Sequence, residues 1–126
     1  MPGGLAAEAL GMLWAVLQDF RQWGEVRTIA ALDPRFEQRI PGLCRETLPA
    51  DEVIRAGTGD HEEVYLSLLK RCDAVLLIAP ETDGILSRLA EQAETEGIPL
   101  LGCSAAAVAM AENKAVCSRL FDLVNL

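Results

Sequence analysis

The sequence is poor in aromatic side chains, in histidine and in basic residues. Aromatic residues make up 5% of the 126 positions, so Leu, Ala, Val and Ile must fill the core. That mixture suits helices layered on a buried sheet. Eleven Lys and Arg face 19 Asp and Glu, which gives a net charge of −8. Because clustered basic side chains supply the affinity for nucleic acid and for anionic membranes, this balance argues against both partners.

The cysteines and the hydrophobic runs argue against a zinc-binding, a disulfide-bonded and a membrane-spanning protein. No CxxC pair and no zinc-like spacing is formed by the four cysteines, Cys44, Cys72, Cys103 and Cys117. We therefore expect reduced thiols and a cytoplasmic location. The longest apolar stretch, residues 98–111, is interrupted by a proline, a glycine and a serine, and is too short to span a bilayer. The sequence predicts a soluble protein without a membrane partner.

Periodic segments predict an α/β fold in one domain over residues 1–126. Strands are expected at residues 26–32, near 53–54, at 74–79 and at 98–101, and helices at 5–23, 60–72, 85–96, from 105 and over 112–123. The continuous apolar run Ala74 to Ala79 is typical of a strand buried on both faces of a parallel sheet. This alternation predicts a Rossmann-like, doubly wound parallel sheet of three or four strands.

The first helix is predicted by apolar residues at three-and-four spacing. Gly24 and Gly97 are expected to end two helices, Asp33-Pro34 to form a turn, and Asp60 to cap the helix that follows it. Residues 35–59 show little periodicity.

Two loops follow predicted strands at the edge where parallel sheets bind ligands. The first contains Glu81, Thr82 and Asp83. In one interpretation, Thr82 or Asp83 is an N-cap and the charges favour the positive end of the helix. In the other, Glu81 points into a cleft and accepts a hydrogen bond from an amine or hydroxyl of a substrate. The sequence leaves both open.

The second loop, Gly102 to Ser104, precedes an Ala-rich helix. Ser104 is either a simple cap or part of a helix start whose exposed amides bind phosphate or carboxylate. Cys103 has no base supplied nearby in sequence, which argues against a nucleophile. His61 is the single histidine, and Tyr65 stands where a zinc-protease motif needs a second histidine, so a solvated His61 at a capped helix start is expected.

A resemblance to a known family appears over residues 73–121, DAVLLIAPETDGILSRLAEQAETEGIPLLGCSAAAVAMAENKAVCSRLF. This segment resembles the end of the pre-ATP-grasp domain of ATP-grasp ligases. The shared features are the strand entering Ala79-Pro80-Glu81, the Asp83-Gly84-Ile85-Leu86 helix start, the Leu101 to Ser104 turn and Glu112-Asn113-Lys114. The subgroup it is most similar to contains the tyramine– or tyrosine–glutamate ligases of methanofuran-type cofactor biosynthesis, in one-carbon metabolism.

The resemblance implies a ligase that activates a carboxylate as an acyl-phosphate with ATP, which an amine then attacks. It implies ATP and Mg²⁺ for the full-length family, held between two later lobes, and no cofactor in this chain alone. The substrate, an amine or amino acid, would contact Glu81, Thr82, Asp83 and Ser104. Lys114 occupies the position of a lysine that reaches nucleotide phosphates in many members. No catalytic and no metal-binding residue is expected in this chain.

The sequence departs from the family pattern in three places. Asn113 stands where Asp is common. The chain opens at the loop Gly3-Gly4, without the strand that precedes this loop in the family, so we expect unpaired strand edges and self-association as a homodimer. It stops at Leu126, where the ATP-holding lobes should begin, so we expect little or no ligase activity alone.

Two other interpretations stay open. The chain could be a stand-alone binding or assembly module that pairs with itself or with a separate ATP-grasp chain. A flavodoxin-like or receiver-like domain ranks last, because the strand at residues 74–79 ends in Ala79-Pro80 and lacks the aspartate that a receiver needs.

Overall fold

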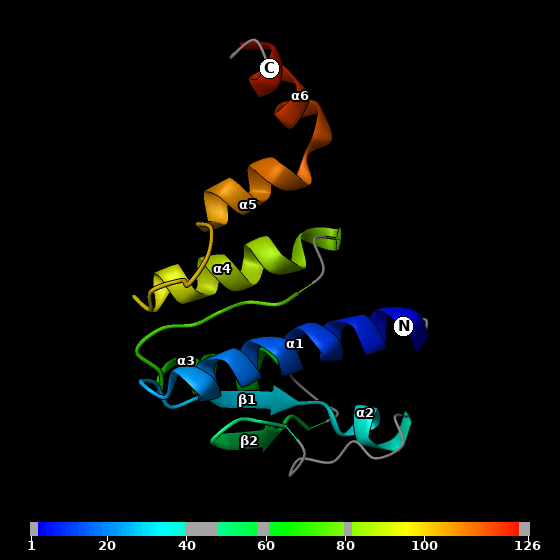
Figure 1. Cartoon of the computed structure of the whole chain (residues 1–126). Coiled ribbons are helices and arrows are strands. Elements are labelled where there is room, and N and C mark those ends of the chain that lie inside the picture. The colour runs from blue at the N-terminus through cyan, green and yellow to red at the C-terminus, as the bar shows by residue number, and fades with distance from the viewer. Residues whose placement is uncertain (1–2, 40–47, 58–60, 80–81, 124–126) are drawn as a thin grey trace. The chain divides into compact units, whose positions relative to one another are not determined.

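The computed structural model describes residues 3–39, 48–57, 61–79 and 82–123. Along the chain the elements are α1 (Gly3–Trp23), β1 (Ile29–Leu32), α2 (Pro34–Arg39), β2 (Glu52–Arg55), α3 (His61–Leu69), the 3₁₀ turn η2 (Thr82–Gly84), α4 (Ile85–Thr95), α5 (Ala105–Glu112) and α6 (Lys114–Leu123) (Figure 1). The chain divides into two compact units, Met1–Val64 and Tyr65–Leu126, and the division falls inside α3. Each unit is described by itself below.

The first unit is built on the helix α1, which the three-and-four spacing of apolar residues predicted. Leu17 is buried in the core, and Leu10 and Leu13 pack against it. The two tryptophans that share this spacing, Trp14 and Trp23, are 40% and 61% exposed.

The strands β1 and β2 pair in parallel, with Ile29 opposite Glu52 and Leu32 opposite Arg55. Alternate residues face α1, so Ala30, Leu32 and Val53 complete the core with Leu17 and Leu48. The strand expected over residues 26–32 is therefore confirmed in its second half, and the short strand near Val53 is confirmed.

A side-chain contact fixes the register where the two strands begin. The Asp51 carboxylate accepts hydrogen bonds from the Thr28 backbone amide at 2.7 Å and from its hydroxyl at 3.0 Å. The Thr28 carbonyl accepts from the amide of Glu52 at 3.1 Å. The Thr28 amide lowers the pKa of Asp51 below its usual value, because it stabilises the ionised carboxylate.

Helix α2 is an element that the sequence analysis did not expect. Asp33 and Pro34 were interpreted as a turn, but Pro34 is the first residue of a helix, the position proline tolerates best. The Asp33 carboxylate accepts a hydrogen bond from the Arg35 amide at 2.8 Å. The same dipeptide thus ends β1 and starts α2.

In the second unit, α4 and α5 pack side by side and run in opposite directions (Figure 1). Their buried residues are all alanines: Ala90 and Ala93 on α4, and Ala105 on α5. Helix α4 ends as predicted at Gly97, where the Gly97 amide bonds the Glu94 carbonyl and the Ile98 amide bonds the Ala93 carbonyl.

The strands expected at residues 74–79 and 98–101 are reduced to one bridge. Val75 and Leu100 form a parallel bridge, in which the Val75 amide bonds the Pro99 carbonyl at 2.9 Å and the Leu101 amide bonds the Val75 carbonyl at 2.8 Å. The expected neighbourhood and direction are confirmed at this point. The expected burial is wrong, since no residue of 74–79 is fully buried and Leu76 is 39% exposed.

The described residues thus contain a two-stranded parallel sheet and not the predicted sheet of three or four strands. A strand buried on both faces needs partners on both sides and layers above and below. In the second unit Val75 has a single bridging partner, which is too little for a ladder. The prediction of a single domain over residues 1–126 is not tested by this division and stays a prediction.

The remaining helices follow the sequence closely. Helix α3 begins at His61 and ends at Leu69, three residues before the expected end, while the expected cap Asp60 lies outside the described residues. Helix α6 begins two residues later than predicted, at Lys114. Over the described part of the chain, no helix combines the length and the apolar character that a membrane crossing requires.

Two glycines of the first unit give a matched test of α1. Gly11 lies inside the helix, and an added Cβ would meet no atom within 4 Å, so Gly11→Ala should stabilise the chain by about 0.5–1 kcal/mol. Gly24 ends the helix with φ +76°, where Ala is strained, so Gly24→Ala should destabilise by about 1–2 kcal/mol. Urea unfolding followed by far-ultraviolet circular dichroism measures both, and equal effects of one sign would contradict this account of α1.

Candidate functional site

The first predicted loop leads into α4 through a left-handed turn. Asp83 has φ +59° and is exposed, and Gly84, with φ +62°, is the N-cap of α4 without a side-chain hydrogen bond. The interpretation of Asp83 as the N-cap of α4 is therefore wrong, and a capping contact of the Thr82 side chain stays a prediction. Thr82 begins η2, but its side chain lies outside the described ones, and Glu81 lies outside the described residues altogether.

The second predicted loop is closed by contacts within the unit. Ser104 is the N-cap of α5, and its hydroxyl accepts a hydrogen bond from the Ala107 amide at 3.3 Å. The Ala105 amide donates to Glu94 Oε1 of α4 at 3.0 Å. A carboxylate of the chain itself thus lies where the anion-binding interpretation of Ser104 places a ligand.

The antiparallel helix pair separates the two loops. Glu94, which contacts the start of α5, and Ser87, in the first turn of α4, are about 10 Å apart along the helix at 1.5 Å per residue. Asp83 precedes the Ser87 end, and Ser104 lies at the Glu94 end. The structure therefore does not bring Asp83 and Ser104 to one point of the unit, although the sequence analysis expected their loops to share an edge.

A polar contact that the sequence analysis missed lies at the Asp83 end of the pair. Ser87 Oγ lies 3.1 Å from the Gly84 carbonyl and 3.3 Å from Glu112 Oε2, on the last turn of α5. The other carboxylate oxygen, Glu112 Oε1, is buried without a hydrogen-bond partner among the described residues. The 25 residues between Ser87 and Glu112 explain the omission, since neither residue belongs to a local motif.

Lys114 lies beyond the same end of the helix pair. It is the exposed first residue of α6, two positions after Glu112. Asn113 joins α5 to α6, because its Oδ1 accepts hydrogen bonds from the amides of Ala115 at 3.1 Å and Val116 at 3.2 Å. Asparagine thus performs the capping that an aspartate could perform at this position. The predicted nucleotide contact of Lys114 stays a prediction.

The first unit has a charged cluster at the carboxyl ends of its two strands. Asp33 follows β1 directly, and the guanidinium of Arg35 donates to both of its carboxylate oxygens. Arg35 Nη2 also lies 3.3 Å from Nε2 of His61, at the start of α3. The expected solvated histidine is therefore exposed but not isolated. Arg55 at the end of β2 pairs with Glu37 of α2 at 2.9 Å.

These charges are balanced within the cluster. Each arginine has a carboxylate of its own, so neither guanidinium is an uncompensated anion site. Hydrogen bonding from Arg35 holds the pKa of Asp33 below its usual value of 3.8. The contacts support a structural role for this cluster.

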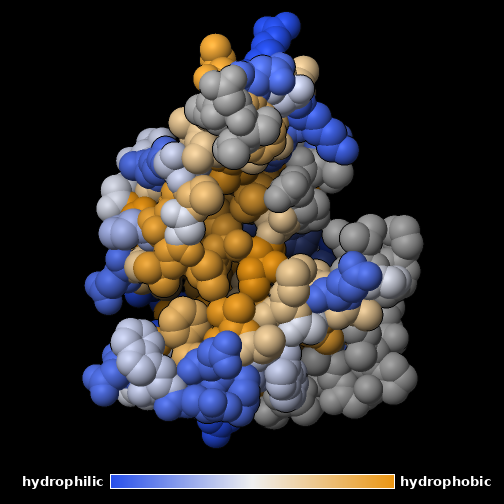
Figure 2. All heavy atoms as spheres, turned by 45° about the horizontal axis from the view of Figure 1, so that its top comes forward, coloured by the Kyte–Doolittle hydropathy of each residue, from blue (hydrophilic) through white to orange (hydrophobic). Residues whose placement is uncertain are grey.

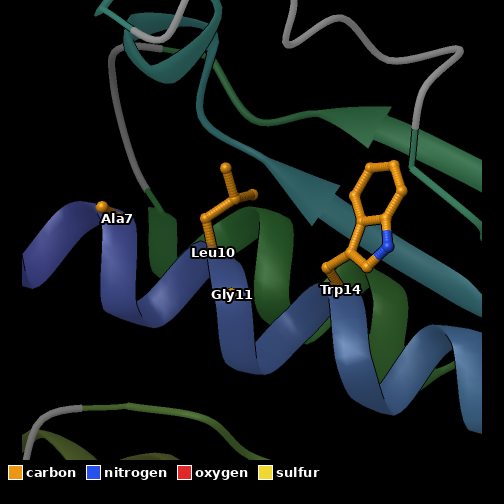
Figure 3. A pocket seen from close by; sticks show the side chains of 4 residues that line it. All are labelled: Ala7, Leu10, Gly11 and Trp14. Carbon is orange, nitrogen blue, oxygen red and sulfur yellow. The ribbon is translucent and has the colours of Figure 1, made fainter.

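An apolar hollow runs along α1 in the first unit (Figure 3). It is lined by Ala7, Leu10, Gly11 and Trp14, and the Leu10 and Trp14 side chains project from the same side of the helix. None of these side chains carries an acid, a base or a nucleophile. The hollow is therefore suited to an apolar side chain or ligand, and its lining residues cannot perform acid–base chemistry.

The comparison with known families decides the classification. The family model for the pre ATP-grasp 3 domain matches residues 26–108, about two thirds of the chain. The chain belongs to the pre-ATP-grasp 3 domain family. No curated protein and no solved structure gave a significant match. The match confirms the resemblance at the level of an N-terminal domain of an ATP-grasp enzyme.

Within this pre-ATP-grasp domain, the match spans β1 to the first turn of α5 and leaves out α1 and α6. It covers the loops of Asp83 and Ser104, but Glu112 and Lys114 follow its last matched residue. The region expected to be least regular, residues 35–59, lies within the match. The family therefore accounts for the strand-and-helix alternation that carried the α/β prediction.

ATP and Mg²⁺ are the cofactors that an ATP-grasp context implies. In the ranges that the structure describes, no three His, Cys, Asp or Glu side chains gather to hold a metal ion. Phosphoryl transfer needs carboxylates for Mg²⁺ and a basic clamp on the phosphates, and Lys114 alone is not such a clamp. The described residues of the pre-ATP-grasp domain do not fit an Mg²⁺–ATP complex, and we assign no step of phosphoryl transfer to them.

The Asp33 cluster predicts a pH dependence of stability. A lowered pKa in the folded state means that ionised Asp33 stabilises the fold above pH 3.8, and that this contribution disappears as the pH falls through the lower folded value. Asp33→Asn keeps a residue that caps helices but removes the charge, so it should cost up to about 1 kcal/mol at pH 7. The difference between the variant and the original chain should become smaller as the pH falls below 3.8.

Urea midpoints at pH 7, 5 and 2.5 measure this difference, with Asp19→Asn on the exposed surface of α1 as the charge-matched control. A constant difference between Asp33→Asn and the original chain across this range would show that the carboxylate charge does not stabilise the first unit.

Proposed function

We propose that this chain is the substrate-side domain of a cytoplasmic ATP-dependent carboxylate–amine ligase. The observation that carries the proposal is the pre-ATP-grasp 3 family match over residues 26–108. In such a ligase, ATP converts a carboxylate to an acyl-phosphate, and the amine nitrogen attacks the acyl carbon while phosphate leaves. ATP and Mg²⁺ are bound by ATP-grasp lobes, and the present chain contributes the surface that orients a substrate.

The finer assignment is to a tyramine– or tyrosine–glutamate ligase of methanofuran-type cofactor biosynthesis. It rests on the resemblance of the APETDGIL segment, residues 79–86, to that subgroup. In this assignment Glu81, Thr82 and Asp83 contact the amine or amino-acid substrate, and Lys114 reaches the phosphates of the nucleotide. Ser104 contacts substrate only if an anionic group displaces Glu94 from the Ala105 amide.

A ligand titration of the 126-residue chain tests the substrate role. We expect tyramine, L-tyrosine or L-glutamate to shift the amide resonances of Asp83 and its neighbours in ¹H–¹⁵N spectra. Asp83→Asn should weaken this binding about tenfold by removing a charged acceptor, and it keeps a residue that tolerates φ +59°. Asp73→Asn, an exposed position before the bridge at Val75, is the control. If none of the three ligands shifts these resonances, the substrate role is wrong.

A second candidate function, an assembly module, is supported by the exposed side of α6. This helix has no buried residue, and Leu120, Phe121 and Leu123 are 39%, 55% and 77% exposed. Figure 2 shows apolar side chains open to solvent among the charged ones. Exposed large apolar side chains in a group are a common property of interaction surfaces. We propose that this surface pairs with a second copy, and a separate ATP-grasp chain is the other partner considered.

Light scattering behind a sizing column tests the homodimer. The original chain should change from the mass of one chain toward that of two as its concentration rises. Phe121→Gln should remain a monomer, because it removes the largest exposed apolar side chain of α6, whereas Ser118→Gln on the same helix should dimerise like the original chain. A monomer at every concentration, up to about millimolar, argues against self-association.

A further inference from the structure

We infer that the carboxylate of Glu112, with Ser87 and the Gly84 carbonyl, binds a primary ammonium group. These groups lie at the end of the α4–α5 pair that the Asp83 loop approaches, and Ser87 lies within 3.3 Å of both acceptors. Neither the family match, which ends at residue 108, nor the resemblance to the ligase subgroup assigns a role to Glu112. The inference rests on the proposed function only for identifying the ammonium as that of an amine substrate.

The hydrogen-bond count at this place is unbalanced. Ser87 has one hydroxyl proton, and it can serve either the Gly84 carbonyl or Glu112 Oε2 at one time. Glu112 Oε1 is buried and has no partner among the described residues. The Gly84 carbonyl, at the N-cap of α4, already accepts the first amide bond of the helix, so the acceptor left without a donor is Glu112 Oε1. A covered carboxylate oxygen without a donor is costly.

A primary ammonium group supplies the donor that Glu112 Oε1 lacks. It carries three N–H donors and one positive charge, so it can bond Oε1, Oε2 and a carbonyl while neutralising the carboxylate. A metal ion is a poorer occupant, because one carboxylate, one hydroxyl and one carbonyl are few ligands for a divalent cation, and no metal-like group of side chains gathers in the described ranges.

The surroundings leave the carboxylate within reach. Glu112 is half-buried as a residue, and the last torsion of a glutamate side chain is soft, so Oε1 can turn toward an incoming N–H while α5 stays in place. Asp83 is exposed at the same end and adds negative charge, which attracts a cation. Two positive charges lie nearby in sequence, the exposed Arg88, which follows Ser87, and the exposed Lys114, which starts α6.

Methylammonium is the probe that tests this site, and tetramethylammonium is the control cation. Both carry one positive charge, but tetramethylammonium has no N–H to donate. At constant ionic strength, methylammonium should shift the amides of Gly84, Ser87 and Glu112 in ¹H–¹⁵N spectra of the 126-residue chain. Saturation is expected with a dissociation constant on the order of 10 mM, the limit for two heavy atoms. Tetramethylammonium should shift them little, and equal shifts from the two cations would overturn the inference without the use of a variant.

Two glutamine variants locate the binding. Glu112→Gln removes the charge with little change of shape and should raise the dissociation constant at least about tenfold. Glu91→Gln makes the same change at an exposed position of α4 and should leave binding unchanged. Equal binding by Glu112→Gln and the original chain would also overturn the inference. A chain that binds methylammonium through Glu112 but ignores tyramine, tyrosine and glutamate keeps this site while the proposed substrate role fails.

Discussion

The second unit depends on the close approach of α4 and α5. Polar contacts join the pair at both ends, Glu94 to the Ala105 amide and Ser87 to Glu112. Ala90 and Ala93 on α4 and Ala105 on α5 are buried, so a larger side chain at any of them would overpack its surroundings. A change in the spacing of α4 and α5 would separate the two end contacts, because hydrogen bonds of about 3 Å tolerate little displacement. The packing of α4 against α5 therefore sets the positions of the Asp83 and Ser104 loops, and any binding by these loops depends on it.

The central element of the first unit is the parallel pair of four-residue strands, β1 and β2. Such a pair is too small to be stable alone. It is fixed at its start by Thr28 and Asp51, and at its finish by Asp33, which ends β1 and caps α2. In a larger sheet, longer strands would stabilise the pairing through more backbone hydrogen bonds. Here side-chain hydrogen bonds at the two ends of β1 stabilise it. The polar residues at both ends of β1 therefore have a structural role, which is to stabilise the strand pair.

Local signals in the sequence were sufficient for most helix ends. Gly24, Gly97 and Ser104 were identified because each acts on backbone groups within five residues, a range that a sequence window covers. The same reasoning missed α2, since Asp33-Pro34 is typical of a turn and of a helix start alike. It also overestimated residues 74–79. Their composition describes a preference for burial, but the number of neighbouring strands is a tertiary property that composition does not contain.

The candidate site was predictable only in part, for a related reason. Asp83 and Ser104 were found because each lies next to a helix start, but their separation follows from the antiparallel packing of α4 and α5. The Ser87–Glu112 contact joins residues 25 positions apart and could be seen only after folding.

The chemistry available to this domain follows from what its described residues offer. At the Asp83 end of α4 and α5 they present oxygen acceptors: the Glu112 carboxylate, the Ser87 hydroxyl and the Gly84 carbonyl. At the other end, Glu94 already occupies the amide that an anion would use. In the ligase that we propose, an acceptor-rich surface of this kind favours the positively charged amine over phosphate.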